Sequence, residues 1–139
     1  WTLVEGEVGS VPFLLRFRTP VLEPPFVAGH PRCLRVVWAY SSEDSSTLPT
    51  PQDSKTLEIF EDRLCAAWEK DATAVLTAVL TFDGARQWVF YTANVDTCGA
   101  LLSGIPQEED PYPIELDVFD DPEWDYLRDE IVRDRGGAA

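Results

Sequence analysis

Residues 73–93, TAVLTAVLTFDGARQWVFYTA, decide the fold, because two β-prone segments meet there at Asp83-Gly84. Val, Thr, Phe, Trp and Tyr fill both segments, and these residue types favour strands. Asp-Gly suits a two-residue type I′ turn, in which both central residues need a positive φ angle. The stretch therefore predicts a β-hairpin over about 74–92, at or near the centre of one sheet.

Alternation along this hairpin predicts two largely apolar faces. Pairing through the turn places Phe82 opposite Ala85, and Leu76 opposite Tyr91. One face then holds Leu76, Ala78, Leu80, Phe82, Val89 and Tyr91, and the other holds Val75, Thr77, Val79, Thr81, Arg86, Trp88 and Phe90. The first face is the more uniformly apolar, so we expect the helices to cover it. The second face is then partly exposed, or is covered by the N-terminal segment.

Four further segments read as strands. Residues 1–8 and 11–18 form a second hairpin through Gly9-Ser10, and Pro12 places it at a sheet edge because proline cannot donate to a ladder. Residues 32–40 are apolar on both faces, which indicates an interior strand. Residues 112–119 alternate, so Ile114, Leu116 and Val118 are expected inward and Glu115 and Asp117 outward.

Helices are predicted in three places. Thr50-Pro51 begins the clearest one, which ends near residue 70 and carries an apolar stripe of Leu57, Phe60, Leu64 and Trp68. A shorter helix over about 95–103 can be capped by Asn94 or Asp96. A final helix is expected from Pro122 to about residue 132, with Asp121 as its N-cap.

The element order is β-β, then β-α-β-β-α-β, then α. This order predicts an α+β fold in which an N-terminal β-hairpin precedes a ferredoxin-like sheet and a C-terminal helix follows it. A chain of 139 residues has the length of one domain. We expect residues 1–132 to form that domain and residues 133–139 to be a disordered tail.

Charge narrows the function classes. The formal net charge of −14 disfavours binding to nucleic acid and to anionic membranes, and it favours a basic protein partner. No stretch has the length of a membrane span, and no signal peptide is visible. Cys33, Cys65 and Cys98 have no zinc-ligand spacing, and unpaired thiols fit a reducing cytoplasm. The sequence therefore predicts a cytoplasmic protein without a cofactor.

Candidate chemistry is sparse. His30 is the only histidine, and it lies in a Gly-His-Pro loop with no nucleophile motif beside it. An acidic cluster around the end of the last strand could bind a partner or hold Mg²⁺ or Ca²⁺, but helix capping and solvated charge explain acids there more simply, and the EF-hand pattern is absent. Its members are Asp117, Asp120, Asp121, Glu123 and Asp125. Trp88 and Phe90 belong either to the core or to a protein-binding face, since the basic residues that RNA stacking needs are missing.

Several features recur together in a known bacterial family. They are Trp1, Glu7, Gly9 and Pro12; His30-Pro31 before a strand with Trp38; Leu57, Phe60-Glu61-Asp62 and Leu64; Thr81, Gly84, Arg86 and Phe90-Tyr91; and Asp121-Pro122-Glu123-Trp124 with Tyr126-Leu127. With them the chain resembles the family called domain of unknown function 695, from Trp1 to about Ile131. The layout is also similar to the regulator of ribonuclease activity B, a small acidic α+β protein that binds and inhibits an RNA-degrading enzyme. The resemblance implies a fold and no activity.

These observations favour a non-catalytic protein-binding or regulatory module with an acidic surface. Its binding residues would come from the acidic cluster and from Trp88 and Phe90. One alternative is a metal-dependent hydrolase that uses the carboxylates of Asp117 to Asp125. Another is an immunity-type inhibitor of a basic toxin, which an acidic small domain would also suit.

Overall fold

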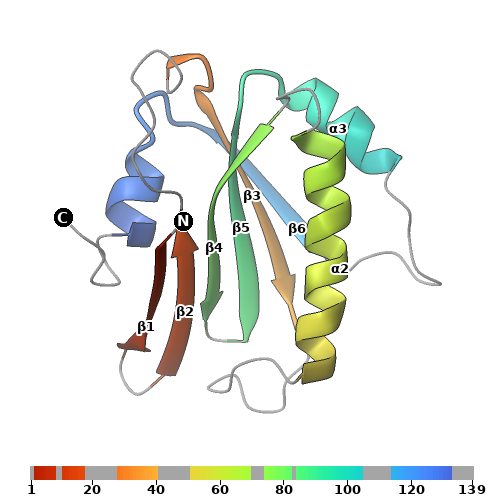
Figure 1. Ribbon diagram of the computed structural model, residues 1–139. Coiled ribbons are helices and arrows are strands. Elements are labelled where there is room, and N and C mark those ends of the chain that lie inside the picture. Colours follow the sequence, from red (N-terminus) through yellow and green to blue (C-terminus); the bar gives the residue numbers. More distant parts are fainter. Residues whose placement is uncertain are drawn as a thin grey trace.

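The computed structural model describes residues 2–8, 11–17, 28–40, 51–69, 74–82, 84–104 and 114–132. Six strands form one antiparallel sheet in the order β1-β2-β4-β5-β3-β6. Their bounds are β1 Thr2–Val8, β2 Val11–Phe17, β3 Arg32–Ala39, β4 Ala74–Phe82, β5 Ala85–Thr92 and β6 Ile114–Asp120. The helices are α2 Pro51–Trp68, α3 Val95–Ser103 and a π-helix, η1, Tyr126–Val132. The chain is thus α+β, as its sequence predicts (Figure 1).

Both predicted hairpins form. β4 and β5 lie in the middle of the sheet, with Phe82 opposite Ala85. β1 and β2 form the N-terminal hairpin at one edge, and β3 is an interior strand between β5 and β6. The Gly9-Ser10 turn, the Thr50 cap, Asp83 and the tail 133–139 lie outside the described residues.

A β-bulge in β4 corrects the predicted register of the central hairpin. Leu76 pairs with Phe90 rather than Tyr91, and the register shifts between Leu76 and Ala78. Thr77 is the extra residue, and its hydroxyl donates a 2.8 Å hydrogen bond to the carbonyl oxygen of Val89. A bulge moves the following side chains to the opposite face. Leu76 therefore lies on the same face as Phe90.

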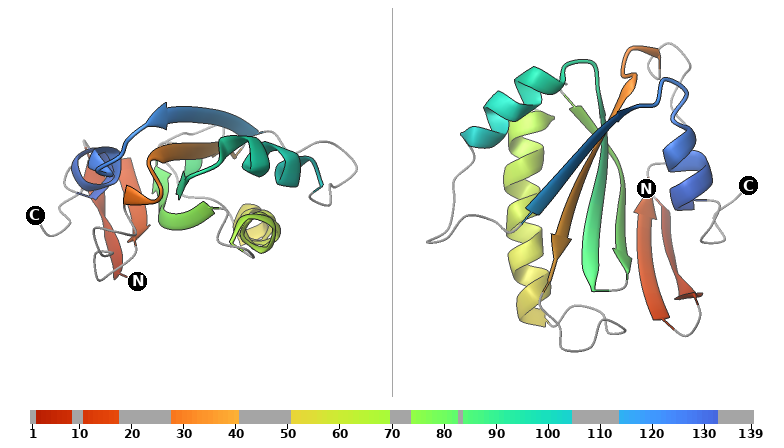
Figure 2. Two further views of the ribbon diagram at one scale, coloured as in Figure 1. Left: turned by 90° about the horizontal axis from the view of Figure 1, so that it is seen from above. Right: turned by 180° about the vertical axis from the view of Figure 1, so that it is seen from behind.

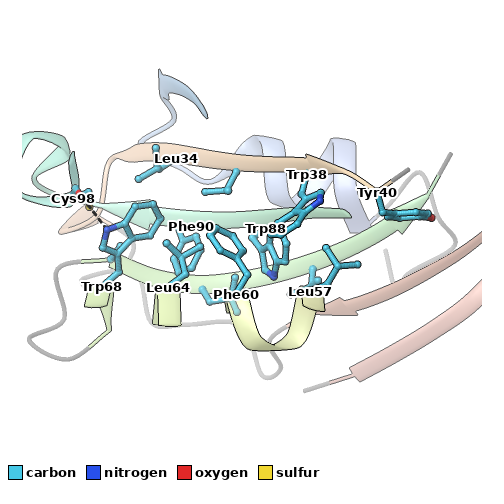
Figure 3. Close-up of a cluster of buried hydrophobic side chains, with 14 residues drawn as sticks. Leu34, Trp38, Tyr40, Leu57, Phe60, Leu64, Trp68, Trp88, Phe90 and Cys98 are labelled. Atoms are coloured by element: carbon cyan, nitrogen blue, oxygen red, sulfur yellow. Dashed lines mark hydrogen bonds between the residues drawn. The ribbon is translucent and has the colours of Figure 1, made fainter. Parts of the chain in front are cut away.

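α2 and α3 cover the face of the sheet opposite to the predicted one, whereas η1 lies on the predicted face (Figure 2). α2 packs on the face that carries Trp88 and Phe90, and its buried residues are the predicted Leu57, Phe60, Leu64 and Trp68. The rings of Trp88 and Phe90 explain why α2 packs on this face. The apolar area that they bury outweighs the cost of the polar threonine hydroxyls on the same face. Figure 3 shows these rings in contact. The ring centroids of Phe60 and Trp88 are 5.2 Å apart and those of Trp68 and Phe90 are 4.8 Å apart, both pairs edge-to-face.

A second core fills the opposite face. Leu15, Ala78, Leu80, Val89 and Tyr91 lie there with Phe13, Phe17 and Cys33, and Trp124 and Ile131 cover them. The predicted α-helix from Pro122 is wrong in its start and its type. Residues 122–123 form a turn, Trp124 adopts a φ of 59°, and the π-helix begins at Tyr126.

Strand β6 corrects a further expectation. Leu116 and Val118 were expected inward, yet they are 44% and 38% exposed. They lie opposite Val36 and Leu34, on the face that α2 covers. β6 is the edge strand, however, and the described helices leave much of both side chains in solvent.

Candidate binding surfaces

Trp88 and Phe90, which the sequence offered as binding residues, are completely buried. Both rings lie beneath α2 in the first core. The indole Nε1 of Trp88 donates a 2.8 Å hydrogen bond to Glu61 Oε1 of α2. Neither ring has any exposed surface to offer a partner, so their role in this structure is packing.

Asp121 is the one member of the acidic cluster that is buried. Its Oδ2 accepts a 2.7 Å hydrogen bond from the Tyr91 hydroxyl and one of 2.9 Å from the backbone N–H of Tyr126. Its Oδ1 accepts the backbone N–H of Asp125 at 2.9 Å. Asp121 therefore accepts backbone N–H groups at the start of the C-terminal helical segment, but from a position before the 122–123 turn and not as the N-cap of a helix that starts at Pro122.

The remaining acids of the cluster are on the surface but dispersed. Asp117 pairs with Arg35, Asp120 pairs with Arg32 at 2.8 Å, and Asp125 pairs with Arg128. Glu123 is exposed in the turn before η1. Asp117 lies opposite Arg35 and Asp120 opposite Arg32, three positions apart on the strand, so they point to different faces of the sheet. Within the described ranges, no three His, Cys, Asp or Glu side chains are grouped so that they could hold a metal ion.

An exposed apolar row, which we call the β6 row, runs along the edge strand. It consists of the exposed Leu116 and Val118 and the half-buried Ile114, which lie on one face of the strand. The opposite edge strand, β1, is different: its exposed face carries Leu3, which is 63% exposed, and then Glu5 and Glu7. Charged side chains on an edge oppose strand pairing with another chain. On β6 the acidic side chains Glu115 and Asp117 lie on the opposite face of the strand, so the β6 row is both uncharged and largely exposed.

A groove opens between α2 and the β1–β2–β4 part of the sheet, on the same face as α2. Its volume is about 410 Å³. Leu3, Leu14 and Val79 supply apolar walls, Arg16, Arg86 and Thr81 supply donors, and Glu58, Glu61 and Asp62 of α2 supply carboxylates. We call this the Arg86 groove.

Two arginines of the Arg86 groove are held in different ways. Arg16 Nη2 contacts both carboxylate oxygens of Glu61, at 2.7 and 2.8 Å. Arg86 donates through Nε to Thr81 Oγ1 at 2.9 Å. In the part of the chain that the structure describes, no carboxylate forms an ion pair with Arg86. Burial lowers the pKa of Arg86, Glu61 raises it, and the positive charge of Arg16 lowers it further.

His30 and the cysteines occupy packing positions. The backbone carbonyl of His30 accepts a 2.9 Å hydrogen bond from the Trp124 indole, whose ring stacks on Tyr91 at 4.4 Å. All three cysteines are free thiols. Burial is the main cause that raises the pKa of Cys33 and of Cys65 to about 12, so both are protonated at neutral pH.

Local patterns in the sequence predict neither the Arg86 groove nor the exposure of the β6 row. Arg86 lies on β5, and Arg16 lies on β2 opposite Leu3 of β1. Only the strand order, with β2 beside β4, brings the two arginines to one face. Arg16 of β2 and Glu61 of α2 form one ion pair although they are 45 positions apart in the sequence. No local sequence pattern marks such a pair.

A family model matches most of the chain. The model of a family described as a family of unknown function, DUF695, covers residues 1–130. No curated protein and no solved structure matches the chain. In the described part of the chain, none of the helices combines the length and apolar character needed to cross a bilayer.

Proposed function

Because the chain belongs to the DUF695 family of unknown function, we propose its function from its own surface: it is a protein-binding module that receives an extended basic segment along β6. The observation that carries this proposal is the exposure of Leu116 and Val118, at 44% and 38%, on an edge strand. An edge strand presents unpaired N–H and C=O groups, and an added strand can pair with them.

Side-chain pattern favours β6 over the other edge. Each edge strand has one acidic row, Glu5 and Glu7 on β1 and Glu115 and Asp117 on β6. The two edges differ in their apolar side chains, because Val4 of β1 packs against the second core whereas Leu116 and Val118 of β6 are exposed. An arriving strand could place alternate apolar side chains beside Leu116 and Val118. We therefore assign the docking surface to β6.

Charge favours a basic partner over a second copy of the chain. Two copies would each bring a net charge of −14 to the contact. The face of β6 opposite the apolar row carries Glu115 and Asp117, which would attract lysine or arginine on alternate positions of an added strand. Regulation of a basic protein, or inhibition of a basic toxin, would be special cases of this binding mode.

We also interpret the arrangement as ferredoxin-like. The strand order β6-β3-β5-β4, with α2 and α3 as the connections, supports this interpretation, and the β1–β2 hairpin extends the sheet beyond β4. In that interpretation β6 is the edge strand of the ferredoxin-like unit itself. Catalysis by the acidic cluster is less favoured, because Asp121 is buried and Asp117 and Asp120 point to opposite faces.

The proposal can be tested with a synthetic peptide of alternating lysine and valine. Backbone amide hydrogen exchange, followed by NMR, reports which strand the peptide covers. We expect the outward-facing amides of β6 to exchange more slowly when the peptide is present, and those of β1 to be unchanged. A peptide of alternating glutamate and valine should protect neither edge.

Two variants make the test specific. Leu116→Lys combined with Val118→Lys should abolish the protection, because both changes place charge in the apolar row. Leu3→Lys, the matched change on the other edge, should leave it intact. Protection on β1, or equal protection by the acidic peptide, would contradict the proposal. A dimer in sedimentation that only the β6 variant dissociates would also contradict it, since the occupant would then be a second copy.

A further inference from the structure

We propose that the Arg86 groove binds a small zwitterion of the amino-acid type, with its carboxylate on Arg86 and Thr81 and its apolar side chain on Leu3, Leu14 and Val79. This site is separate from the β6 row and does not depend on it. β6 lies at the far edge of the sheet from β1 and β2, with β4, β5 and β3 between them. The volume of about 410 Å³ is in the range of small-molecule sites, which run from about 300 to 1,000 Å³.

Arg86 is the residue of the groove that would bind an anion. It projects from β5 across β4, where Thr81 lies directly opposite it in the strand register. Its Nε donates to the Thr81 hydroxyl, and no described carboxylate pairs with its guanidinium. Burial lowers the pKa of Arg86 although the charges of Glu61 and Glu58 raise it, and among the described residues no counter-ion is in direct contact with the guanidinium. A ligand carboxylate would supply that counter-ion with the planar, bidentate geometry that a guanidinium prefers.

Glu61 forms no ion pair with Arg86, and its oxygens accept hydrogen bonds from other donors. Oε1 accepts from Trp88 Nε1 at 2.8 Å and from Arg16 Nη2 at 2.7 Å, and Oε2 accepts from the same Arg16 nitrogen at 2.8 Å. Glu61 therefore fixes Arg16 at one wall of the groove. The side chain of Arg16 is still 41% exposed, and its positive charge adds to that of Arg86.

The other carboxylates decide the class of ligand. Glu58 and Asp62 are exposed residues of α2 that line the same groove. They would repel a ligand that carries only negative charge, but they would attract an ammonium group placed next to the ligand carboxylate. The apolar residues Leu3, Leu14 and Val79 complete the lining. A carboxylate, an ammonium and a short apolar side chain together match the three kinds of wall.

Leucine and three analogues test which of these three groups the groove binds. Leucine carries all three groups, 4-methylpentanoate lacks the ammonium, 3-methylbutylamine lacks the carboxylate, and N-acetyl-leucine imitates the carboxyl terminus of a peptide. The indole N–H signal of Trp88 in NMR spectra is the reporter, because that group donates to Glu61 in the groove wall. The indole groups of Trp68 and Trp124 bond to backbone carbonyls elsewhere and serve as internal references.

We expect millimolar leucine to shift the Trp88 signal and to leave the signals of Trp68 and Trp124 in place. 4-Methylpentanoate and N-acetyl-leucine should bind more weakly, and 3-methylbutylamine should not bind. Arg86→Gln should weaken leucine binding by about tenfold, the order expected for one charge-assisted contact. Arg86→Lys should weaken it less, and Arg128→Gln, a matched loss of charge on η1, should have no effect.

Three results would overturn the inference. The first is a Trp88 indole signal that does not shift at the highest leucine concentration that dissolves. The second is binding that Arg86→Gln leaves intact while the variant remains folded. The third is binding of N-acetyl-leucine or 4-methylpentanoate as tight as that of leucine, since the ammonium would then play no part. None of these outcomes bears on the peptide test at β6.

Discussion

The hydroxyl of Tyr91, in the middle of the sheet, donates a 2.7 Å hydrogen bond to Asp121 Oδ2. The same carboxylate accepts the backbone N–H groups of Asp125 and Tyr126, so one side chain joins β5 to the start of η1. Tyr91 is fully buried and Asp121 nearly so. This hydrogen bond is therefore shielded from water. A buried donor or acceptor that lacks a hydrogen-bond partner there costs free energy of folding.

Asp121→Ala should destabilise the protein strongly. It leaves the Tyr91 hydroxyl and two backbone N–H groups without their acceptor, and each unmet buried group costs about 1–3 kcal/mol. We expect a loss of at least about 3 kcal/mol in urea unfolding. Asp120→Ala is the matched control, because its carboxylate is 80% exposed and a surface ion pair contributes about 0–1 kcal/mol. Equal losses for the two variants would contradict this role of Asp121.

Gly6 and Gly99 should respond oppositely to alanine. A Cβ at Gly6 would lie 2.9 Å from the Phe13 ring, so Gly6→Ala should cost about 1–3 kcal/mol through overpacking. A Cβ at Gly99, within α3, meets nothing within 4 Å, so Gly99→Ala should stabilise by up to about 1 kcal/mol. Thermal unfolding of both variants tests the pair. Phe13→Leu in the Gly6→Ala background should recover part of the loss.

Glu61→Ala should cost more than the loss of a surface ion pair. Without Glu61 the buried Trp88 indole loses its acceptor, which costs about 1–3 kcal/mol, and Arg16 loses its partner. Glu61→Gln keeps an acceptor and should cost less. Glu58→Ala, one turn earlier on an exposed position of α2, should change the free energy of unfolding by less than about 0.5 kcal/mol. Urea unfolding distinguishes the three variants.

Stability should fall as the pH rises above about 9. Burial raises the pKa of Cys33 from 9.0 to about 12 in the folded protein, and it also raises the pKa of Tyr91. Between these values the unfolded chain releases a proton that the folded chain keeps, so the free energy of unfolding decreases with pH. Cys33→Ala should make this decrease shallower. Val36→Ala, a buried truncation on the same strand without a titrating group, should lower stability at every pH by a similar amount.

Local signals predicted most of the elements, because each has its own physical cause. Asn94 accepts the backbone N–H of Thr97 as an N-cap, and α3 spans the predicted 95–103. The apolar stripe of α2 is buried as its spacing requires. The bulge at Thr77 was not predictable, since nothing in an alternating run marks where one residue is extra. Its consequence is that Leu76 lies on the face opposite to the predicted one.

The candidate surfaces were harder to predict than the elements. Burial of Trp88 and Phe90 follows from the face that α2 selects, and both faces of the hairpin were apolar enough to be chosen. Asp121 was predicted as the N-cap of a helix from Pro122, but it instead bonds across the 122–123 turn to the start of η1 and to Tyr91, which depends on how η1 returns to the sheet. The Arg86 groove needs β2 beside β4 and α2 above both. Such contacts between distant segments have no local sequence signal.

The division of the interior by the sheet has a consequence for synthesis on the ribosome. α2 and α3 precede β6 in the chain, so the layer around Phe60 and Phe90 can close early. The layer around Leu15 and Tyr91 stays open until Trp124 and Ile131 emerge. Until Trp124 and Ile131 are synthesised, a nascent chain would therefore have one closed hydrophobic layer and one that is open to solvent. The open layer is the place where a chaperone would bind.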